Sequence, residues 1–452
     1  MAESLPEAVA RGAARQVYRL LRISAPLLRP IYRQIGLEQR ARAVTALVRI
    51  GWNGTPVKMP VPSELAIAAP GTLRPGVACI GHPSAESGAG EALRATAKGF
   101  AATGVPFTVV GLETYTTARL GDDSMARHAS SYLDRRVNLL CDGIVGAEIA
   151  LAALGPQALD GRLTILRPFW ELAKVPDRFA PLLGTVQEIW APSEFVRAAF
   201  AAAVEVPVLR VPVPVELGQV ARVERASLSL PDAATLFLFA FDPCSFFVRK
   251  NPLGVIEAFK RAFPSKSADV GLVIKTLDAG PHAHSLNKIK AAIAGDERIH
   301  LIERTMSRAE MNGLFSASDA YVSLHRSEGF GFGLAEAMAL GKPVVGTAYS
   351  GTADFLTPDT GYPVPFTLVP VRAGEYPDHE GQVWAEPDLD AAAERMRAIV
   401  EDPAEGRRLA CAGQAFVKTH HSAAAVGKLM RDRLQALGLL RSGTRAPEFL
   451  GE

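Results

Sequence analysis

Short runs of β-forming residues alternate with helical patterns along most of the chain, and this alternation limits the possible folds more than any other feature. A first series of such runs covers residues 77–80, 107–110, 163–166, 188–190 and 208–211, and a second covers residues 236–241, 271–274, 300–302, 320–324 and 343–346. Strands separated by helices favour right-handed β-α-β units and a parallel sheet. The sequence therefore predicts an α/β fold with two doubly wound, Rossmann-like parallel sheets.

The segment between the two series, residues 212–230, is rich in Pro, Arg, Glu and Ser and lacks strong periodicity, which is typical of an interdomain linker. With 452 residues the chain is long enough for two large domains. We predict a basic helical N-terminal extension (1–60), an N-terminal domain (61–220), a C-terminal domain (221–425), and a C-terminal helix with a tail (426–452). This last helix is expected to pack back toward the N-terminal domain.

The composition excludes several classes of protein. Charged residues make up 21% of the chain and the net charge is +2, which excludes a disordered or supercharged protein. The four cysteines lie far apart without CxxC spacing, which argues against a disulfide scaffold or a zinc site. Arginines outside the N-terminal segment form no stripe with interleaved aromatics, so nucleic-acid binding is not expected. With no long apolar span and no signal-like start, we expect a cytoplasmic protein.

The first fifty residues differ from the rest, because they contain nine arginines against three glutamates. Arg11, Arg15, Arg19 and Arg22 recur at helix spacing beside apolar positions. Residues 1–52 could therefore lie on an anionic membrane surface as an amphipathic patch. An ordinary packing helix with a solvated arginine edge explains the pattern equally well.

The segment from Ser327 to Pro343 reads as a glycine-rich turn, a helix, a glycine stop and a proline before the next strand. Glycines at 329, 331 and 333 allow close approach of the backbone to a ligand, and the following helix directs free N–H groups into the turn. This arrangement suits a phosphate. It is neither a dinucleotide fingerprint, because Leu334 replaces the third glycine, nor a P-loop, because Pro343 follows Gly341-Lys342.

Two glutamates, Glu328 and Glu336, flank this turn with seven residues between them. The spacing alone does not distinguish them from surface carboxylates. Within SEGFGFGLAEAMALGKPVV, however, the pair resembles the signature of retaining glycosyltransferase family 4 and related families of the GT-B fold. The resemblance extends from about residue 76, through residues 170–171, 188–193, 241–252 and 349–351. It implies two Rossmann-like domains across a cleft, the C-terminal one binding a nucleotide-sugar donor and the N-terminal one the acceptor.

The resemblance also implies roles on the donor side. Glu328 would orient the hydroxyls of the donor sugar, and Glu336 would bind the ribose hydroxyls. Arg249 and Lys250 would stabilise the leaving diphosphate, although Ser245 stands where the family arginine is usual, so Lys275 is an alternative to Arg249. Backbone amides would contact the sugar and diphosphate at Gly329, Phe330, Gly331, Phe332, Gly333, Ser350 and Gly351. Asp354 replaces a usual glutamate, so a nucleotide contact and a helix cap both remain open.

On the N-terminal side, Gly88 and Gly90 resemble the glycine loop that closes over the donor phosphates. Many members of the family have a cleft histidine after a later strand, but this chain has none there. Glu171 is our candidate for the acceptor side, with His82 and His128 as alternatives. No cofactor and no metal is expected: Asp388-Leu389-Asp390 resembles a metal-binding D-x-D but suits a helix start, and the pairs His282/His284 and His420/His421 suit the surface.

We therefore expect a retaining, metal-independent hexosyltransferase that uses a nucleoside-diphosphate sugar and a saccharide or lipid-linked acceptor, in bacterial cell-surface polysaccharide or lipopolysaccharide synthesis. One alternative is a catalytically silent GT-B subunit that scaffolds a polysaccharide-assembly complex. Another is a nucleotide-sugar epimerase, or a phosphorylase, of the same fold.

Overall fold

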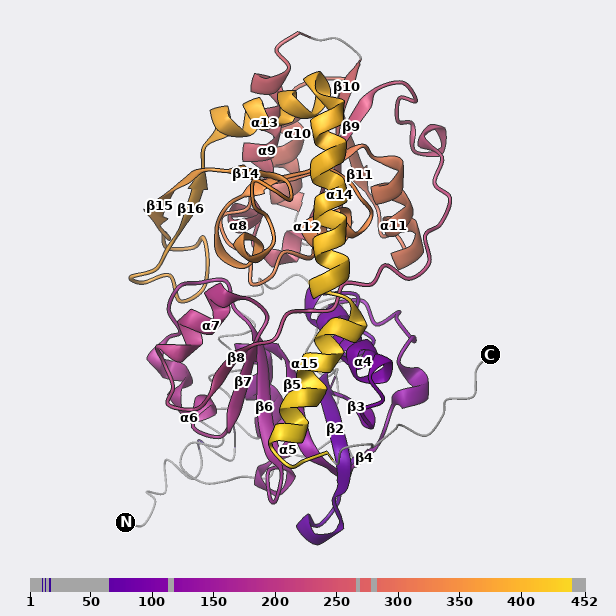
Figure 1. The fold of residues 1–452 in the computed structure, drawn as a ribbon. Helices are drawn as coiled ribbons and strands as arrows, with labels where there is room; N and C mark the ends of the chain where they lie inside the picture. The colour runs from indigo at the N-terminus through magenta and orange to yellow at the C-terminus, as the bar shows by residue number, and fades with distance from the viewer. Residues whose placement is uncertain are drawn as a thin grey trace.

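The computed structural model describes residues 65–112, 118–265, 269–277 and 283–440, together with Ala10, Ala13, Gln16 and Val17, which are helical. Nearly all of the predicted N-terminal extension thus lies outside the described residues. The described chain folds into two α/β domains, one above the other in Figure 1, each built on a six-stranded parallel sheet. The predicted fold class is confirmed.

The N-terminal sheet has the strand order β3-β2-β5-β6-β7-β8, with every neighbouring pair parallel. Its central strands are almost fully buried, which explains their continuous apolar sequences. The strands are β2 (Arg74–Gly81), β3 (Phe107–Gly111), β5 (Arg135–Gly143), β6 (Leu163–Phe169), β7 (Glu188–Ala191) and β8 (Val208–Arg210). The helices are α4 (Gly88–Ala102), α5 (Ile144–Leu154), α6 (Ala180–Leu183) and α7 (Glu194–Ala201). A separate two-stranded pair joins β1 (Ala66–Ile67) to β4 (Tyr132–Leu133).

The C-terminal sheet has the order β11-β10-β9-β12-β13-β14. Its strands are β9 (Thr235–Ala240), β10 (Val270–Thr276), β11 (Ile299–Glu303), β12 (Ala320–Ser323), β13 (Val344–Thr347) and β14 (Tyr362–Val364). Its helices are α8 (Phe247–Lys250), α9 (Pro252–Ala262), α10 (Ala283–Ile293), α11 (Arg308–Ala317), α12 (Phe332–Ala339), α13 (Leu389–Glu401) and α14 (Pro403–His420). An antiparallel hairpin, β15 (Phe366–Pro370) and β16 (Val383–Pro387), was not anticipated from the sequence.

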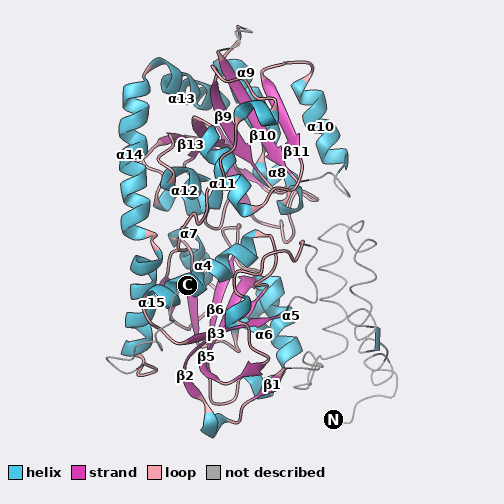
Figure 2. Ribbon diagram, turned by 90° about the vertical axis from the view of Figure 1, so that its right-hand side faces the viewer, coloured by secondary structure: helices cyan, strands magenta, loops and turns pink. Residues whose placement is uncertain are grey.

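The chain passes between the domains twice, and the two passages are hydrogen-bonded to each other. After β8 the chain runs upward, and after α14 it returns as α15 (Ala423–Ala436), which lies along α4 of the N-terminal domain in Figures 1 and 2. The Val215 amide donates to the His421 carbonyl over 2.7 Å, and His421 Nδ1 lies 3.2 Å from the Val213 carbonyl. His421 is buried, so the expected surface position is wrong for this histidine. These contacts join the two passages of the chain between the domains.

Close packing holds α15 on α4. A Cβ at Gly427 would lie 2.1 Å from the Gly99 carbonyl oxygen, so only a glycine lets the two helices approach this closely. On the other side of the molecule, Tyr376 and Trp384 of the hairpin region share an apolar cluster with Trp170 and Phe179 of the N-terminal domain. The cleft is therefore bounded on both sides by contacts between the domains.

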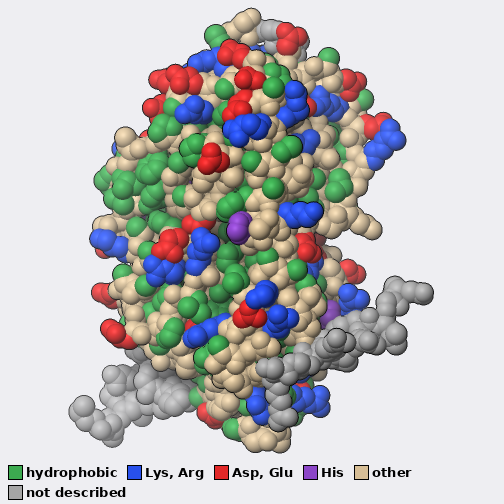
Figure 3. All heavy atoms as spheres, in the orientation of Figure 1, with side chains coloured by type: hydrophobic (Ala, Val, Ile, Leu, Met, Phe, Trp, Pro, Cys, Tyr) green, Lys and Arg blue, Asp and Glu red, His purple; other side chains and the backbone are tan. Residues whose placement is uncertain are grey.

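The surface in Figure 3 mixes acidic and basic side chains, without a basic stripe on the face shown. Among the described residues, no helix is both long and apolar enough to cross a membrane.

Candidate functional site

A cavity of about 1910 Å³ opens between the two domains. It is lined by the loops at the carboxyl ends of both sheets, where ligands bind in open α/β folds. Its volume exceeds that of a usual small-molecule pocket of roughly 300–1,000 Å³, so it has room for more than one substrate.

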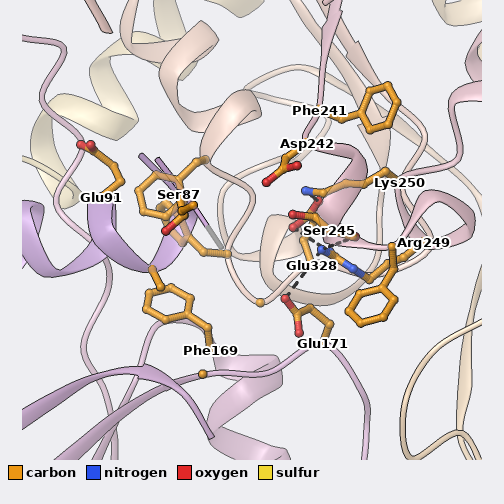
Figure 4. Close-up of a pocket in the computed structure, with 18 of the residues that line it drawn as sticks. Ser87, Glu91, Phe169, Glu171, Phe241, Asp242, Ser245, Arg249, Lys250 and Glu328 are labelled. Atoms are coloured by element: carbon orange, nitrogen blue, oxygen red, sulfur yellow. Dashed lines mark hydrogen bonds and ion pairs between the residues drawn. The ribbon is translucent and has the colours of Figure 1, made fainter. Parts of the chain in front are cut away.

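The buried guanidinium of Arg249, near the end of α8, lines this cavity and points toward Glu328 and Glu171 (Figure 4). Its Nη1 lies 3.1 Å from Glu328 Oε2, and its Nη2 lies 3.7 Å from Glu171 Oε1. It also donates to the carbonyls of Ser327 (2.8 Å) and Ser245 (3.0 Å). Glu328 belongs to the C-terminal domain and Glu171 to the N-terminal domain, so one cation is placed between carboxylates of both domains.

Lys250 adds a second cation, because its Nζ pairs with Glu328 Oε1. Burial by itself raises the pKa of Glu328, but Lys250 and Arg249 hold that pKa at about 2. Burial also acts to lower the pKa of Arg249, whereas Glu328 and Glu171 raise it above its ordinary value. Glu328 is therefore ionised and Arg249 charged at neutral pH, and the Glu328 backbone amide is fixed by donation to Ser350 Oγ over 2.8 Å.

The glycine-rich turn leads directly from Glu328 into α12. Gly331 is the N-cap of that helix with a φ of 99°, and no side chain caps it. A Cβ at Gly331 would lie 2.4 Å from Thr352 Cγ2, so both the backbone angle and the space require glycine. Helices leave their first N–H groups without intrahelical partners, and these bind anions well. All five predicted residues of this turn, 329–333, line the cavity.

Ser350 and Gly351 lie behind the turn rather than on the cavity wall. The Gly351 amide donates to the Glu328 carbonyl over 2.9 Å, and a Cβ at Gly351 would lie 2.4 Å from the Gly329 carbonyl oxygen. Ser193 Oγ of the N-terminal domain donates to that same Gly329 carbonyl over 2.7 Å. These residues therefore position the turn, while the turn itself faces the cavity.

Glu336 lies on α12 at the cavity, where it pairs with Arg308 at the start of α11. Burial raises the pKa of Glu336, and Arg308 acts against that rise. Sequence reasoning missed Arg308. A local signal was present, because Ser307 and Glu310 form a capping box that marks the start of α11 after a strand. Arg308 follows Ser307 directly, at that helix start.

Lys275, the alternative to Arg249, also lines the cavity. Its buried Nζ donates to the Thr276 carbonyl over 2.9 Å. Burial lowers the pKa of Lys275 to about 8, and the charge of Arg304 acts in the same direction.

On the N-terminal side, Gly88 is the first residue of α4 and lines the cavity. Gly90 does not: its amide donates to the N-cap Ser87 Oγ over 3.3 Å, and a Cβ there would lie 2.1 Å from the Ala85 carbonyl oxygen. Of the two glycines, only Gly88 is placed to meet a ligand.

Glu171 lines the cavity and accepts a hydrogen bond of 2.5 Å from Tyr376 Oη. Of its alternatives, His82 also lines the cavity, with its Nε2 2.8 Å from Asp142 Oδ2. His128 lies instead against the ring of Phe107, with the ring centroids 4.6 Å apart. Tyr376 was missed from the sequence, because it belongs to a hairpin loop far along the chain.

Two aspartates accept from backbone amides at helix starts. Asp354 Oδ2 accepts from the amide of Glu194, the first residue of α7 in the opposite domain, and from Arg210 Nη1, each over 3.0 Å, while Ser193 is the N-cap of that helix. Asp388 accepts from the amides of Asp390 and Ala391, each over 3.0 Å, which confirms the predicted helix start. In the part of the chain that the structure describes, no three His, Cys, Asp or Glu side chains are grouped to hold a metal ion.

Comparison with known proteins agrees with this geometry. Residues 244–416, which include Arg249, Lys250, Glu328 and Glu336, match the family described as glycosyl transferases group 1. The C-terminal domain is thus a glycosyltransferase domain, and the chain is an enzyme of that class. No curated protein matches the chain by sequence.

Solved structures show the same two-domain GT-B fold at low sequence identity. Sucrose-phosphate synthase from Thermosynechococcus elongatus is 16% identical with a TM-score of 0.60, over 81% of this chain and 99% of that one. Anabaena HepE, solved in complex with UDP and glucose, is 13% identical with a TM-score of 0.58, over 80% and 100%. A glycosyltransferase from Rickettsia africae is 13% identical with a TM-score of 0.56, over 80% and 99%. These likenesses establish the fold of the glycosyltransferase.

The pKa of Glu328 leads to a prediction about stability. Folding lowers the pKa of the Glu328 carboxyl from its ordinary value of 4.5 to about 2. Such a carboxyl stabilises the folded protein at pH values above 4.5, and this contribution is lost as the pH falls toward about 2. We expect Glu328→Gln to destabilise the protein at pH 7, and that destabilisation to shrink by about 2 kcal/mol at pH 3. Urea unfolding at both pH values measures it, with exposed Glu205→Gln as the control. An equal destabilisation at both pH values would contradict the ion-pair account.

Proposed function

We propose that this glycosyltransferase moves a hexose, with retention of configuration, from a nucleoside-diphosphate sugar to a saccharide or lipid-linked acceptor. The observation that carries the proposal is the convergence of Lys250 and Arg249 on Glu328 beside the uncapped start of α12. Fixed cations and free amides at one point suit a diphosphate, and the adjacent carboxylate suits sugar hydroxyls. The complex of Anabaena HepE with UDP and glucose, a protein of the same fold, supports a donor of this chemical class.

On this proposal each group has a distinct task. Amides of residues 329–333 bind the diphosphate, Glu336 binds the ribose hydroxyls, and Glu328 orients the hydroxyls of the hexose. Lys250 offsets the charge that develops on the leaving phosphate. The guanidinium of Arg249 already contacts two carbonyls and two carboxylates, so it orients Glu328 and Glu171 as well as adding positive charge.

The transfer itself needs no resident metal on this proposal. The bond between the anomeric carbon and the phosphate oxygen breaks, and the acceptor oxygen bonds to that carbon from the same face. The acceptor's proton passes to the departing phosphate, which leaves as the nucleoside diphosphate. Glu171, which lines the cavity from the N-terminal domain, contacts the acceptor on this proposal.

The alternatives of a silent scaffolding subunit and a nucleotide-sugar epimerase predict different products. The first forms none, and the second forms an isomeric nucleotide sugar without release of a nucleoside diphosphate. The intact set of Lys250, Glu328 and Glu336 favours transfer.

We expect the EDTA-treated protein to release a nucleoside diphosphate from one member of a panel of UDP-, GDP- and ADP-hexoses. Lys250→Met should lower kcat by about a hundredfold, because it removes one fixed charge from the leaving group. Lys418→Met, on α14 and exposed, is the matched control. Nucleotide release followed by chromatography provides the measurement. Equal activity of Lys250→Met and the wild type, or activity that EDTA abolishes, would contradict the proposal.

We further propose that the enzyme acts in bacterial cell-surface polysaccharide or lipopolysaccharide synthesis at the inner face of the cell membrane, held there by residues 1–52. Nine arginines in the first fifty residues support this attachment, each adding on the order of 1 kcal/mol near an anionic surface. The full chain should sediment with vesicles containing phosphatidylglycerol and remain in solution with phosphatidylcholine vesicles. Unchanged sedimentation after deletion of residues 1–52 would contradict it.

A further inference from the structure

The loop of residues 371–382, between β15 and β16, reaches from the C-terminal domain to the N-terminal domain. It is docked at two points. Arg178 forms a bidentate pair with Asp378, with both N–O distances 2.7 Å. Gln382 forms two hydrogen bonds with the backbone of Lys174. Its side-chain amide donates to the Lys174 carbonyl over 2.8 Å, and its side-chain oxygen accepts from the Lys174 amide over 3.1 Å. The loop is therefore fixed to the segment that follows β6.

Tyr376 lies two residues before the first of these docking points, Asp378, and is buried. Its ring packs against Phe246, with the ring centroids 4.4 Å apart, and lies edge-on to Trp384. Its hydroxyl donates to Glu171 Oε2 over 2.5 Å. Burial, together with the charge of Glu171, raises the pKa of Tyr376 well above its ordinary value, so the phenol stays a hydrogen-bond donor.

The two oxygens of Glu171 are thereby given different partners. Oε2 accepts from Tyr376, while Oε1 faces Arg249 Nη2 at 3.7 Å. Phe246, against which Tyr376 packs, is three residues before Arg249 and holds a left-handed backbone with a φ of 63°. Tyr376 thus contacts both the carboxylate that faces Arg249 and the ring of Phe246, three residues before Arg249.

We propose that Tyr376 is a positioning residue, which orients Glu171 for the acceptor and holds Arg249 between Glu171 and Glu328. This inference rests on the proposed hexosyl transfer. Because Tyr376 comes from the C-terminal domain and Glu171 from the N-terminal domain, the acceptor side of the site is complete only when the domains are closed on each other. The 371–382 loop, which no family motif in the sequence indicates, then positions the acceptor side of the site.

Tyr376→Phe tests the inference, because it keeps the ring and removes only the hydroxyl. We expect kcat for transfer to fall about tenfold, while the KM of the donor changes by less than about twofold and the melting temperature is kept. Tyr362→Phe is the matched control: the Tyr362 hydroxyl is buried in the C-terminal domain and has no hydrogen-bond partner among the described residues. This control should match the wild type in all three measurements.

A double-mutant cycle separates positioning from a general structural role. If Tyr376 acts through Glu171, Tyr376→Phe should have little further effect on kcat in the Glu171→Gln protein. The same tenfold loss in both backgrounds, or no loss in the wild-type background, overturns the inference and leaves the hexosyl transfer standing. A wild-type enzyme that transfers no hexose from any donor overturns the proposed function, and this inference with it.

Discussion

The buried charge of Arg249 is the interaction on which the arrangement of this cleft depends. An isolated cation in a protein interior is costly, and removing one partner of a buried pair typically costs about 3–5 kcal/mol. Arg249 is compensated by Glu328 from its own domain and by Glu171 from the opposite one. The buried positive charge of Arg249 is thus compensated by carboxylates of both domains.

Other polar contacts also join the two domains across the cleft. Asp354 accepts from the first amide of α7 in the N-terminal domain, and Ser193 donates to the carbonyl of Gly329 in the glycine-rich turn. The two passages of the chain are bonded to each other through Val215 and His421. The turn that faces the cavity is therefore positioned by Ser193 of the N-terminal domain and by Ser350 and Gly351 of its own domain.

The fold could be predicted because its signals are local: most strands are short apolar runs, and most helices have a helical pattern of apolar residues, although β5 and β14 were not among the predicted runs. The glycine turn and the pair Glu328 and Glu336 were found for the same reason, since all lie within ten residues. Tyr376 and the partner of Asp354 could not be predicted, because each acts on a residue of a distant segment, and Arg308 was missed although its capping box was a local signal. The β15–β16 hairpin and the burial of His421 were also missed, since both depend on packing against the other domain or the other passage.

The central claim, that Arg249 holds the two domains together across the cleft, can be measured directly by the distance between paired spin labels, one in each domain. Arg249→Met leaves Glu171 and Glu328 without the cation between them, so the account predicts a longer and broader distance distribution than in the wild type. Arg298→Met, which removes a buried arginine paired with Asp296 within the C-terminal domain, should leave the distribution unchanged. A distribution in Arg249→Met identical to that of the wild type would contradict the account.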